Sequence, residues 1–471
     1  HLRARFHNIE HHRAHLASCF FVSPFERAAL LSIDGFGDFI STMWATGEGN
    51  AIDVLGQVEY PHSTGIVYTA TTQFLGFPHY GDEGKVMGLA PYGHPRFIDE
   101  FREIIRTEEN GQFRLNLDYF RHHSEGVEMT WDHGSPVIGR VYSDAFADLF
   151  GTPRAEGTPL TDRERDIAAS LQLRLEEIAF HVLNNLHERT GLTDLGLAGG
   201  VAYNSVMNGK ILLSTPFKRV YVQPAAGDSG TALGVCYQIY NGVLKCERGE
   251  VMEGSYTGPQ FSNDEVQTAL SGLSFETYTD DEVTKRAAHD IAAGLVVGWF
   301  QGRMEFGPRA LGNRSFLADP RRSDMRELLN RKVKLREWFR PLAPSMTKRA
   351  RIVQMGRIAI ALDRAESVHR RLGGNVETER RFAHGRARRH DDQLGTLKAR
   401  GHLVQICETA RHTGNRFPAP LERFDALHRR PEQLLDAREA TTALRLADLE
   451  DLLLGFIQQL GRLGASLERL T

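Results

Sequence analysis

The sequence predicts an α/β protein built around a sheet with antiparallel and parallel parts. An apolar run at residues 28–33 ends in Asp34-Gly35-Phe36-Gly37-Asp38, and strand-like runs follow at 39–45 and 52–60. Strands joined by such short turns are typical of an antiparallel meander. From residue 161 onward helices and strands alternate instead, which predicts a mainly parallel sheet.

Two helices frame these strands. One is expected over residues 7–21, before the first strand. The other, over 161–186, has Thr161 and Glu164 as a capping box and Gly191 as a stop signal. Its apolar stripe consists of Ile167, Leu171, Leu175, Ile178, Val182 and Leu186. We then expect a strand at 195–198, a helix over 202–213, a strand at 219–222, a glycine-rich loop at 226–230 and a helix from about Thr231.

The chain changes character twice after this region. Residues 251–260 are typical of a linker, and a second module opens at 261–273, with a strand at 295–300. From about Thr347 the chain is rich in arginine and lacks Tyr and Trp, although a Leu-rich amphipathic helix is expected over 434–463. The predicted parts are a large domain at 1–250, part of a small domain at 261–346 and an atypical tail at 347–471.

Composition narrows the class of protein. With 41% apolar and 25% charged residues the chain resembles a soluble globular protein, and no apolar run reaches the ~18 residues of a membrane span. The net charge of −3 favours neither nucleic acid nor a membrane as a partner. Four distant cysteines without a CxxC pair fit a reducing cytoplasm. Because residue 1 is histidine, we expect that the natural chain begins earlier.

A histidine pair predicts a metal site. His11 and His15 are four residues apart, so both lie on one helical face and can bind one ion. His12 points elsewhere, and a histidine at this position excludes the HExxH pattern of zinc proteases. Two ordinary surface histidines are the alternative.

Acidic and glycine-rich turns add further candidates. The glycines around Asp34 let a phosphate approach the backbone, and its carboxylate can position a metal, although a plain hairpin turn would look the same. Gly199-Gly200, between a strand and a helix, suits a nucleotide or serves as a tight packing turn. Asp228 could be a third metal ligand or a helix N-cap.

Three longer stretches are further candidates for ligand binding. Residues 81–93, rich in glycine and charge, are typical of a binding loop. Residues 303–314 and 331–340 place many cationic groups near glycines, which suits phosphate or carbamoyl phosphate. A solvated basic face is the alternative for the cationic stretches.

Seven motifs together resemble the O-carbamoyltransferase family of antibiotic tailoring and nodulation-factor synthesis. The resemblance covers about residues 5–346. The order and spacing of the motifs make it very unlikely that the similarity arose by chance. They are EHHRAHLAS, SIDGFGD, GDEGKVMGLAPYG, LAGGVAYNSVMNGKI, QPAAGDSGTALG, QGRMEFGPRALGNRSFLADPR and NRKVKLREWFRPLAPS.

The resemblance implies a fold and a reaction. A domain of the actin/Hsp70/sugar-kinase fold, similar to the tRNA-threonylcarbamoyl transferase, is joined to part of a threonylcarbamoyl-adenylate-synthase-like domain. The small domain is expected to make carbamoyl-adenylate from carbamoyl phosphate and ATP, releasing pyrophosphate. The large domain then moves the carbamoyl group to a hydroxyl of a small-molecule or sugar acceptor.

The resemblance also assigns residues. The implied ligands of Fe2+ or another divalent metal are His11, His15 and Asp228. The implied contacts of ATP, bound with Mg2+, are Asp34, Gly35, Gly199, Gly200, Asn204, Arg303, Arg309, Arg314, Lys334 and Arg336. A general base must take the proton of the acceptor hydroxyl, and His12 and Glu83 are the candidates.

This chain departs from the family in two places. Family members begin with a strand and a phosphate-approaching loop that would precede His1, and after Ser345 they continue with further strands and an LNTSFN-like motif that residues 347–471 lack. An altered reading frame would produce the arginine-rich tail. We therefore expect impaired carbamoyl-adenylate synthesis by this chain.

Three alternatives remain at this stage. A tRNA threonylcarbamoyl transferase is disfavoured by the basic module at 261–346. A metal- and nucleotide-binding remnant without catalysis is favoured by the atypical tail. A sugar kinase gives the paired histidines no role. The acceptor and the oligomeric state are not predicted.

Overall fold

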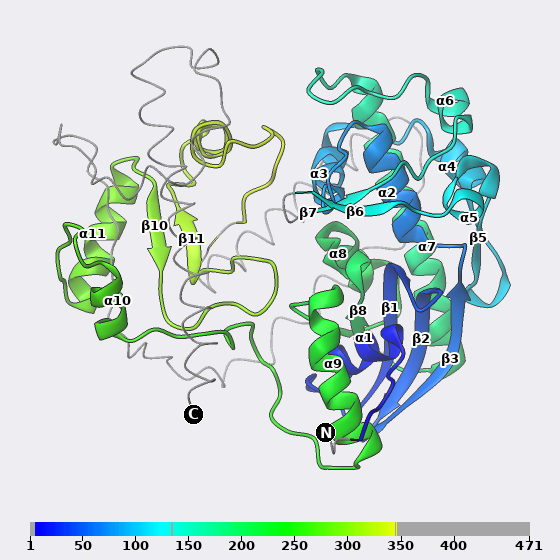
Figure 1. Cartoon of the computed structure of the whole chain (residues 1–471), viewed down its shortest axis with the longest axis horizontal. Coiled ribbons are helices and arrows are strands. Elements are labelled where there is room, and N and C mark those ends of the chain that lie inside the picture. The colour runs from blue at the N-terminus through cyan, green and yellow to red at the C-terminus, as the bar shows by residue number, and fades with distance from the viewer. Residues whose placement is uncertain (1–4, 133–134, 344, 346–471) are drawn as a thin grey trace, which may run out of the picture.

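The structure is a computed structural model that describes residues 5–132, 135–343 and 345. It confirms the α/β class, with a five-stranded sheet at the centre of a large unit (Figure 1). The strand order is β3-β2-β1-β8-β9; β1 pairs antiparallel with β2 and parallel with β8. The strands are β1 Arg27–Gly37, β2 Ile40–Glu48, β3 Ala51–Glu59, β8 Asp194–Ala198 and β9 Arg219–Val222.

Alternate residues of β1 pack on opposite faces of the sheet, as the pleat requires. Ala28 and Leu30 join Leu16 of the first helix in one apolar cluster. Ala29 and Leu31 belong to a larger cluster on the other face. Because both faces are covered, β1 is buried along most of its length, and this fixes the position of its carboxyl end.

Helices cover both faces of the sheet (Figure 1). The first helix and α9 pack against one face, and the helices that contact the larger cluster cover the other. Their bounds are α1 His11–Phe20, α2 Thr64–Phe74, α7 Asp162–Thr190, α8 Ser205–Ser214 and α9 Thr231–Tyr237. No helix of the described part of the chain is long and apolar enough to cross a membrane.

Side-chain caps set several helix ends. The predicted capping box of Thr161 and Glu164 starts α7, and Gly191 ends it in a left-handed conformation. The helix expected from residue 7 begins only at His11, because the Glu10 carboxylate accepts the first free N–H groups. The helix expected from residue 202 begins at Ser205, since Asn204 caps it.

The region between β3 and α7 holds short elements that the sequence did not predict. They add to the larger apolar cluster through residues such as Phe101, Phe146 and Phe150. The helices are α3 Glu83–Leu89, α4 Ile98–Ile104, α5 His122–Glu125 and α6 Ala145–Phe150. The strands are β4 Ile105–Thr107, β5 Phe113–Leu115, β6 Met129–Asp132 and β7 Ser135–Ile138.

A smaller unit follows residue 260, with β10 and β11 paired antiparallel. Its elements are α10 Asn263–Ala269, α11 Asp280–Ala292, β10 Val297–Phe300, β11 Arg314–Leu317 and α12 Met325–Leu328. The expected tail at 347–471, including the helix over 434–463, lies outside the described residues.

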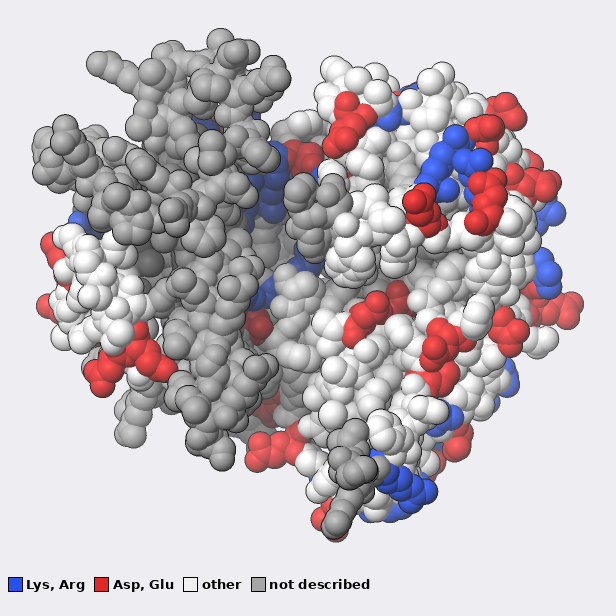
Figure 2. Space-filling view, in the orientation of Figure 1, with Lys and Arg blue, Asp and Glu red and all other residues white. Residues whose placement is uncertain are grey.

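Figure 2 shows basic and acidic side chains interspersed over the visible face of the large unit.

The last described segment of the small unit packs on the large one. The buried ring of Phe339 lies 6.2 Å from that of Phe77, measured between centroids. Lys85 Nζ is 2.9 Å from a carboxylate oxygen of Glu337 and 2.8 Å from one of Asp82. The predicted binding loop at 81–93, most of which forms the helix α3 instead, is therefore held by contacts from the small unit.

Candidate metal centre

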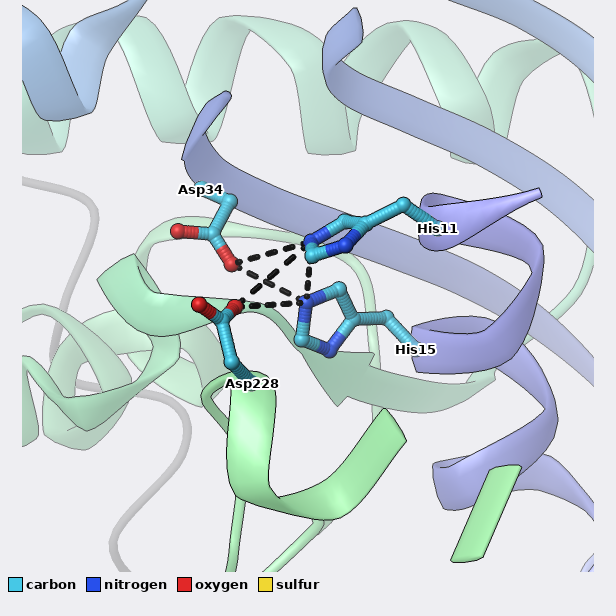
Figure 3. Close-up of side chains that lie close together, drawn as sticks. All are labelled: His11, His15, Asp34 and Asp228. Carbon is cyan, nitrogen blue, oxygen red and sulfur yellow. Dashed lines mark hydrogen bonds and ion pairs between the residues drawn. The ribbon is translucent and has the colours of Figure 1, made fainter. Parts of the chain in front are cut away.

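Four side chains from three separate segments meet at the carboxyl end of β1 (Figure 3). His11 and His15 come from α1, Asp34 from the end of β1, and Asp228 from the short turn before α9. One ligand atom from each lies within 4.8 Å of all the others. The structure thus brings together the three predicted metal ligands and adds Asp34, which the resemblance had assigned to the nucleotide.

Glycines allow these segments to approach so closely. A Cβ at Gly37 would lie 2.1 Å from the ring of His11, so only glycine leaves room for this imidazole. A Cβ at Gly234 would lie 1.8 Å from the carbonyl oxygen of Ala14, so glycine also lets α9 cross α1. Both glycines lie in motifs that carry the family resemblance, and here they position the metal-binding side chains.

The donor atoms converge on one point. His11 Nε2 and His15 Nε2 are 3.0 Å apart, and His15 Nε2 is 3.0 Å from Asp34 Oδ2. Asp228 Oδ1 lies 3.6 Å from His11 Nε2 and 3.7 Å from His15 Nε2. Two imidazole lone pairs facing each other repel, so a proton or a cation is needed among these atoms.

The electrostatics of the group favour one positive charge. Burial opposes protonation of His15, but the adjacent carboxylates of Asp228 and Asp34 outweigh it and raise the pKa of His15 to about 9. Burial likewise opposes ionisation of Asp34, yet the adjacent imidazoles of His11 and His15 lower the pKa of its carboxyl. The Asp34 carboxylate therefore stays ionised beside a site that requires a cation.

The donor set fits a divalent first-row metal. Two imidazole nitrogens and two carboxylate oxygens suit Fe2+, Mn2+ or Zn2+, and the residues alone do not select iron among them. The His15 side chain is fully buried, whereas that of Asp228 is 66% exposed, so the group opens toward solvent on the Asp228 side. A ligand can reach the site from that side.

Metal binding is expected to weaken as the pH falls. Below a pKa of about 9 His15 carries a proton that a metal must displace, so the apparent affinity falls about tenfold for each pH unit. Titration with Zn2+ at several pH values measures this dependence. A Zn2+ affinity that does not change between pH 6 and pH 8 would contradict this prediction, because it would mean that the metal displaces no proton from His15.

The predicted nucleotide-contacting turns hold Asp34 in place. Gly200 N–H donates to Asp34 Oδ2 at 2.9 Å, and Gly35 N–H donates to Oδ1 at 2.6 Å. Gly199 has a φ of +92°, which glycine adopts readily. Gly35 and Gly200 thus lie beside the metal-binding group, and Gly199 shapes the turn that presents Gly200.

Asn204 lies in a buried polar network instead. Its Oδ1 accepts from Met207 N–H, and its amide donates to Gln172 Oε1 at 2.8 Å. Gln172 in turn donates to Glu176 Oε1, whose second oxygen accepts from Lys210. These bonds tie α8 to α7 and account for Asn204 structurally; its predicted contact with nucleotide stays a prediction.

The two candidate bases lie in different surroundings. His12 is fully buried, with Nδ1 2.9 Å from Ser32 Oγ and Nε2 2.9 Å from the carbonyl oxygen of Ile40. Burial lowers its pKa to about 4. Both ring nitrogens of His12 are therefore engaged in contacts that hold α1 against the sheet. Glu83 is half-buried, and its Oε1 accepts from Thr69 Oγ1 at 2.7 Å.

Sequence reasoning missed Tyr80. Partial burial is the main reason that the pKa of its hydroxyl is raised. The negative charges of Asp228, Asp34 and Glu83 raise this pKa further. Tyr80 therefore lies within electrostatic reach of both the metal-binding group and Glu83. Its position one residue before the glycine-rich 81–93 region was the signal that could have found it.

Two of the predicted basic residues, Arg303 and Arg314, contact the linker at 251–260 and the loop between β10 and β11. Arg303 donates to the carbonyl oxygens of Gly258 and Thr257. Arg314 Nε donates to the buried carboxylate of Glu305 at 3.0 Å, which also accepts from two backbone N–H groups of the same loop.

The three other predicted basic residues are Arg309, Lys334 and Arg336. Lys334 Nζ lies 4.9 Å from the ring centre of Phe316, and Arg336 Nε donates to Asn330 Oδ1. Arg309 is exposed. These contacts shape the loops on either side of β11, and phosphate binding by the five basic residues stays a prediction.

Comparison with known proteins agrees with the motifs. The family model described as Carbamoyltransferase N-terminus matches residues 2–237, and the one described as Carbamoyltransferase C-terminus matches residues 288–360. HypF of T. kodakarensis, a solved structure, is 17% identical over 49% of this chain and 36% of its own. Its TM-score of 0.26 is too low to support a conclusion about the fold.

Several curated proteins are similar in sequence. An uncharacterized protein of Synechocystis sp. is 44% identical over 72% of this chain and 54% of its own length. Nodulation protein NolNO of Sinorhizobium fredii is 41% identical over 72% and 47%. The 3'-hydroxymethylcephem-O-carbamoyltransferase of Streptomyces clavuligerus is 32% identical over 57% and 45%. The chain spans about half the length of these relatives. It belongs to the carbamoyltransferase family.

Proposed function

We propose that this chain is the transfer part of an O-carbamoyltransferase that places a carbamoyl group on a hydroxyl of a small-molecule or sugar acceptor. The observation that carries the proposal is the convergence of His11, His15, Asp34 and Asp228 on one point beside the Gly199-Gly200 turn. Family membership supports the class of reaction, and the cluster of four side chains is the site at which we propose that it takes place.

The proposed chemistry needs one water for its atoms to balance. Carbamoyl phosphate, water and ATP give carbamoyl-adenylate, pyrophosphate and phosphate. The acceptor oxygen then forms a bond to the carbamoyl carbon, the bond from that carbon to the AMP oxygen breaks, and AMP leaves. A divalent metal held by the four side chains would supply Lewis acidity to the phosphate and the carbonyl.

The chain's own residues have separate roles in this proposal. The Gly200 N–H and Gly35 N–H groups hold the Asp34 carboxylate in its orientation. His12, bonded at both nitrogens, fixes α1 against β1 and β2, and so positions His11 and His15. This geometry favours a positioning role for His12 over the predicted role as a base.

Glu83 is the better-placed proton acceptor. Thr69 occupies Oε1, and no described residue bonds to Oε2, so one carboxylate oxygen is free to accept the proton of the acceptor hydroxyl. Its carboxylate and the metal-binding group both act on Tyr80. We therefore place the acceptor hydroxyl between Glu83 and the metal-binding group.

Glu83→Gln is expected to lower the rate of carbamoyl transfer about 100-fold, because the amide keeps the bond from Thr69 but cannot accept a proton. Metal binding should be unchanged. Glu103→Gln is the matched control, since Glu103 accepts from Tyr119 in a different region. A transfer rate that is the same in Glu83→Gln and the wild-type chain would remove Glu83 from the mechanism.

The function is tested by following the carbamoyl group itself. The chain is incubated with labelled carbamoyl phosphate, ATP, Fe2+ and a panel of hydroxyl acceptors, and the label in a carbamate ester and the pyrophosphate are both measured. The proposal predicts an ester that requires ATP and metal, formed at a rate limited by the carbamoyl-adenylate synthesis that is expected to be impaired in this chain. Pyrophosphate without an ester would limit the chain to adenylate formation. Neither product, with metal bound normally, would favour the noncatalytic remnant.

A further inference from the structure

The turn between β1 and β2 carries an aromatic residue that the fold does not explain. Gly37 pairs with Ile40, so the turn consists of Asp38 and Phe39 alone. Their φ angles are +48° and +66°, as in a type I′ turn, which favours Asn or Asp followed by Gly. A bulky side chain at a left-handed position is strained, and such outliers point to function.

Packing does not compensate for this strain. The Phe39 side chain is 78% exposed, and among the described aromatic rings it contacts one, that of Tyr60, at 6.2 Å between centroids. The next hairpin of the same sheet has Gly49 at its positive φ, so this sheet does use glycine in an equivalent turn. Packing among the described residues therefore does not account for the exposed ring of Phe39.

The turn is continuous with the metal-binding group. Asp38 Oδ2 accepts a hydrogen bond from His11 N–H at 3.0 Å, and the His11 ring packs against Gly37. This bond explains Asp38 at its strained position, whereas no bond of the Phe39 side chain does the same. The turn that carries Phe39 is therefore adjacent to the first metal-binding histidine.

Phe39 is the exposed end of a small aromatic cluster, which we call the aromatic platform and which consists of Phe36, Phe39 and Tyr60. The Tyr60 ring lies 5.2 Å from that of Phe36, and its hydroxyl donates to the carbonyl oxygen of His122 at 2.8 Å. Tyr60 N–H donates to the carbonyl oxygen of Phe39. The platform is thus fixed on one side by the fold and open on the other.

We propose that the aromatic platform is the acceptor subsite and that it binds the face of a sugar ring. A sugar presents a flat C–H face, which suits an exposed aromatic ring, and hydroxyls at its edge, which suit nearby carboxylates such as Asp38. An extended alkyl chain requires a groove, and a ring as exposed as Phe39 offers a flat surface instead. The inference rests on the proposed function and names its acceptor class.

The test uses a model sugar and a chain alcohol. Binding of cellobiose and of hexane-1,6-diol to the Zn2+-loaded chain is measured by saturation-transfer NMR, together with Zn2+ affinity. Phe39→Ala should weaken cellobiose binding about tenfold. Phe39→Trp should retain it, as should the matched control Trp131→Ala, which removes a similarly exposed ring on β6. Zn2+ affinity should be the same in all variants.

A fourth variant separates binding from structure. Phe39→Gly relieves the strained position, so it should raise the melting temperature by about 2 °C while weakening cellobiose binding as much as Phe39→Ala does. A residue needed for the fold would show the reverse.

Three results would overturn the inference. They are equal cellobiose binding by Phe39→Ala and the wild-type chain, hexane-1,6-diol binding as tight as cellobiose, and no cellobiose binding by the wild-type chain. Failure of the wild-type chain to bind Zn2+ would instead count against the proposed function.

Discussion

His15→Ala is expected to weaken divalent-metal binding about 100-fold or more. The loss of a residue that only hydrogen-bonds to a metal ligand typically costs 10- to 100-fold in affinity, and His15 itself contributes a donor nitrogen that faces all three other groups. The measurement is a Zn2+ titration against a competing chelator, with circular dichroism to confirm folding. His123→Ala, on an exposed histidine outside the cluster, should bind Zn2+ as the wild-type chain does.

Asp34→Asn provides an independent check, since removing a buried imidazole leaves a cavity. The amide has nearly the shape of the carboxylate but not its charge, so the fold should survive while the metal affinity falls similarly. Zn2+ affinity close to wild type in both His15→Ala and Asp34→Asn would show that the four side chains are not a metal site.

Gly199→Ala is expected to cause the largest loss of stability. At φ +92° and ψ 159° Gly199 occupies a region that is essentially restricted to glycine, and a Cβ there would lie 2.2 Å from the carbonyl oxygen of Ile33. A backbone atom in the central strand cannot move aside easily. We expect a loss of about 3 kcal/mol or more in the free energy of unfolding, measured by urea denaturation.

The control is another glycine of the same motif. Gly209 lies within α8, and a Cβ there would meet nothing within 4 Å, so Gly209→Ala should stabilise the chain by up to about 1 kcal/mol. If Gly199→Ala unfolds at the same urea concentration as the wild-type chain, the tight turn beside Asp34 is wrong as described.

Local sequence patterns account for the helices and strands that were predicted correctly. The capping box of Thr161 and Glu164 defines α7 without help from distant residues, and the apolar strands of the sheet are equally visible. The start of α1 was placed too early because Glu10 is not among the preferred capping residues, yet its carboxylate caps the helix. The short elements between β3 and α7 depend on packing around residues such as Phe146, which no local pattern reveals.

The site was predicted in part for the same reason. The spacing of His11 and His15 is a local property, so the pair could be recognised directly. That Asp34 points into the same group depends on the N–H of Gly200, which is 166 residues away. The burial of His12 between Ser32 and Ile40 likewise depends on the sheet, and it leaves neither ring nitrogen open.

The central claim is that the four side chains hold a metal at which nucleotide binds. Calorimetric titration of ATP at constant Mg2+, with and without Fe2+ under anaerobic conditions, tests it most directly in the wild-type chain and in Asp228→Asn. The account predicts that Fe2+ tightens ATP binding about tenfold or more and that Asp228→Asn loses this gain. ATP affinity that is the same with and without Fe2+, and the same in both chains, would contradict it.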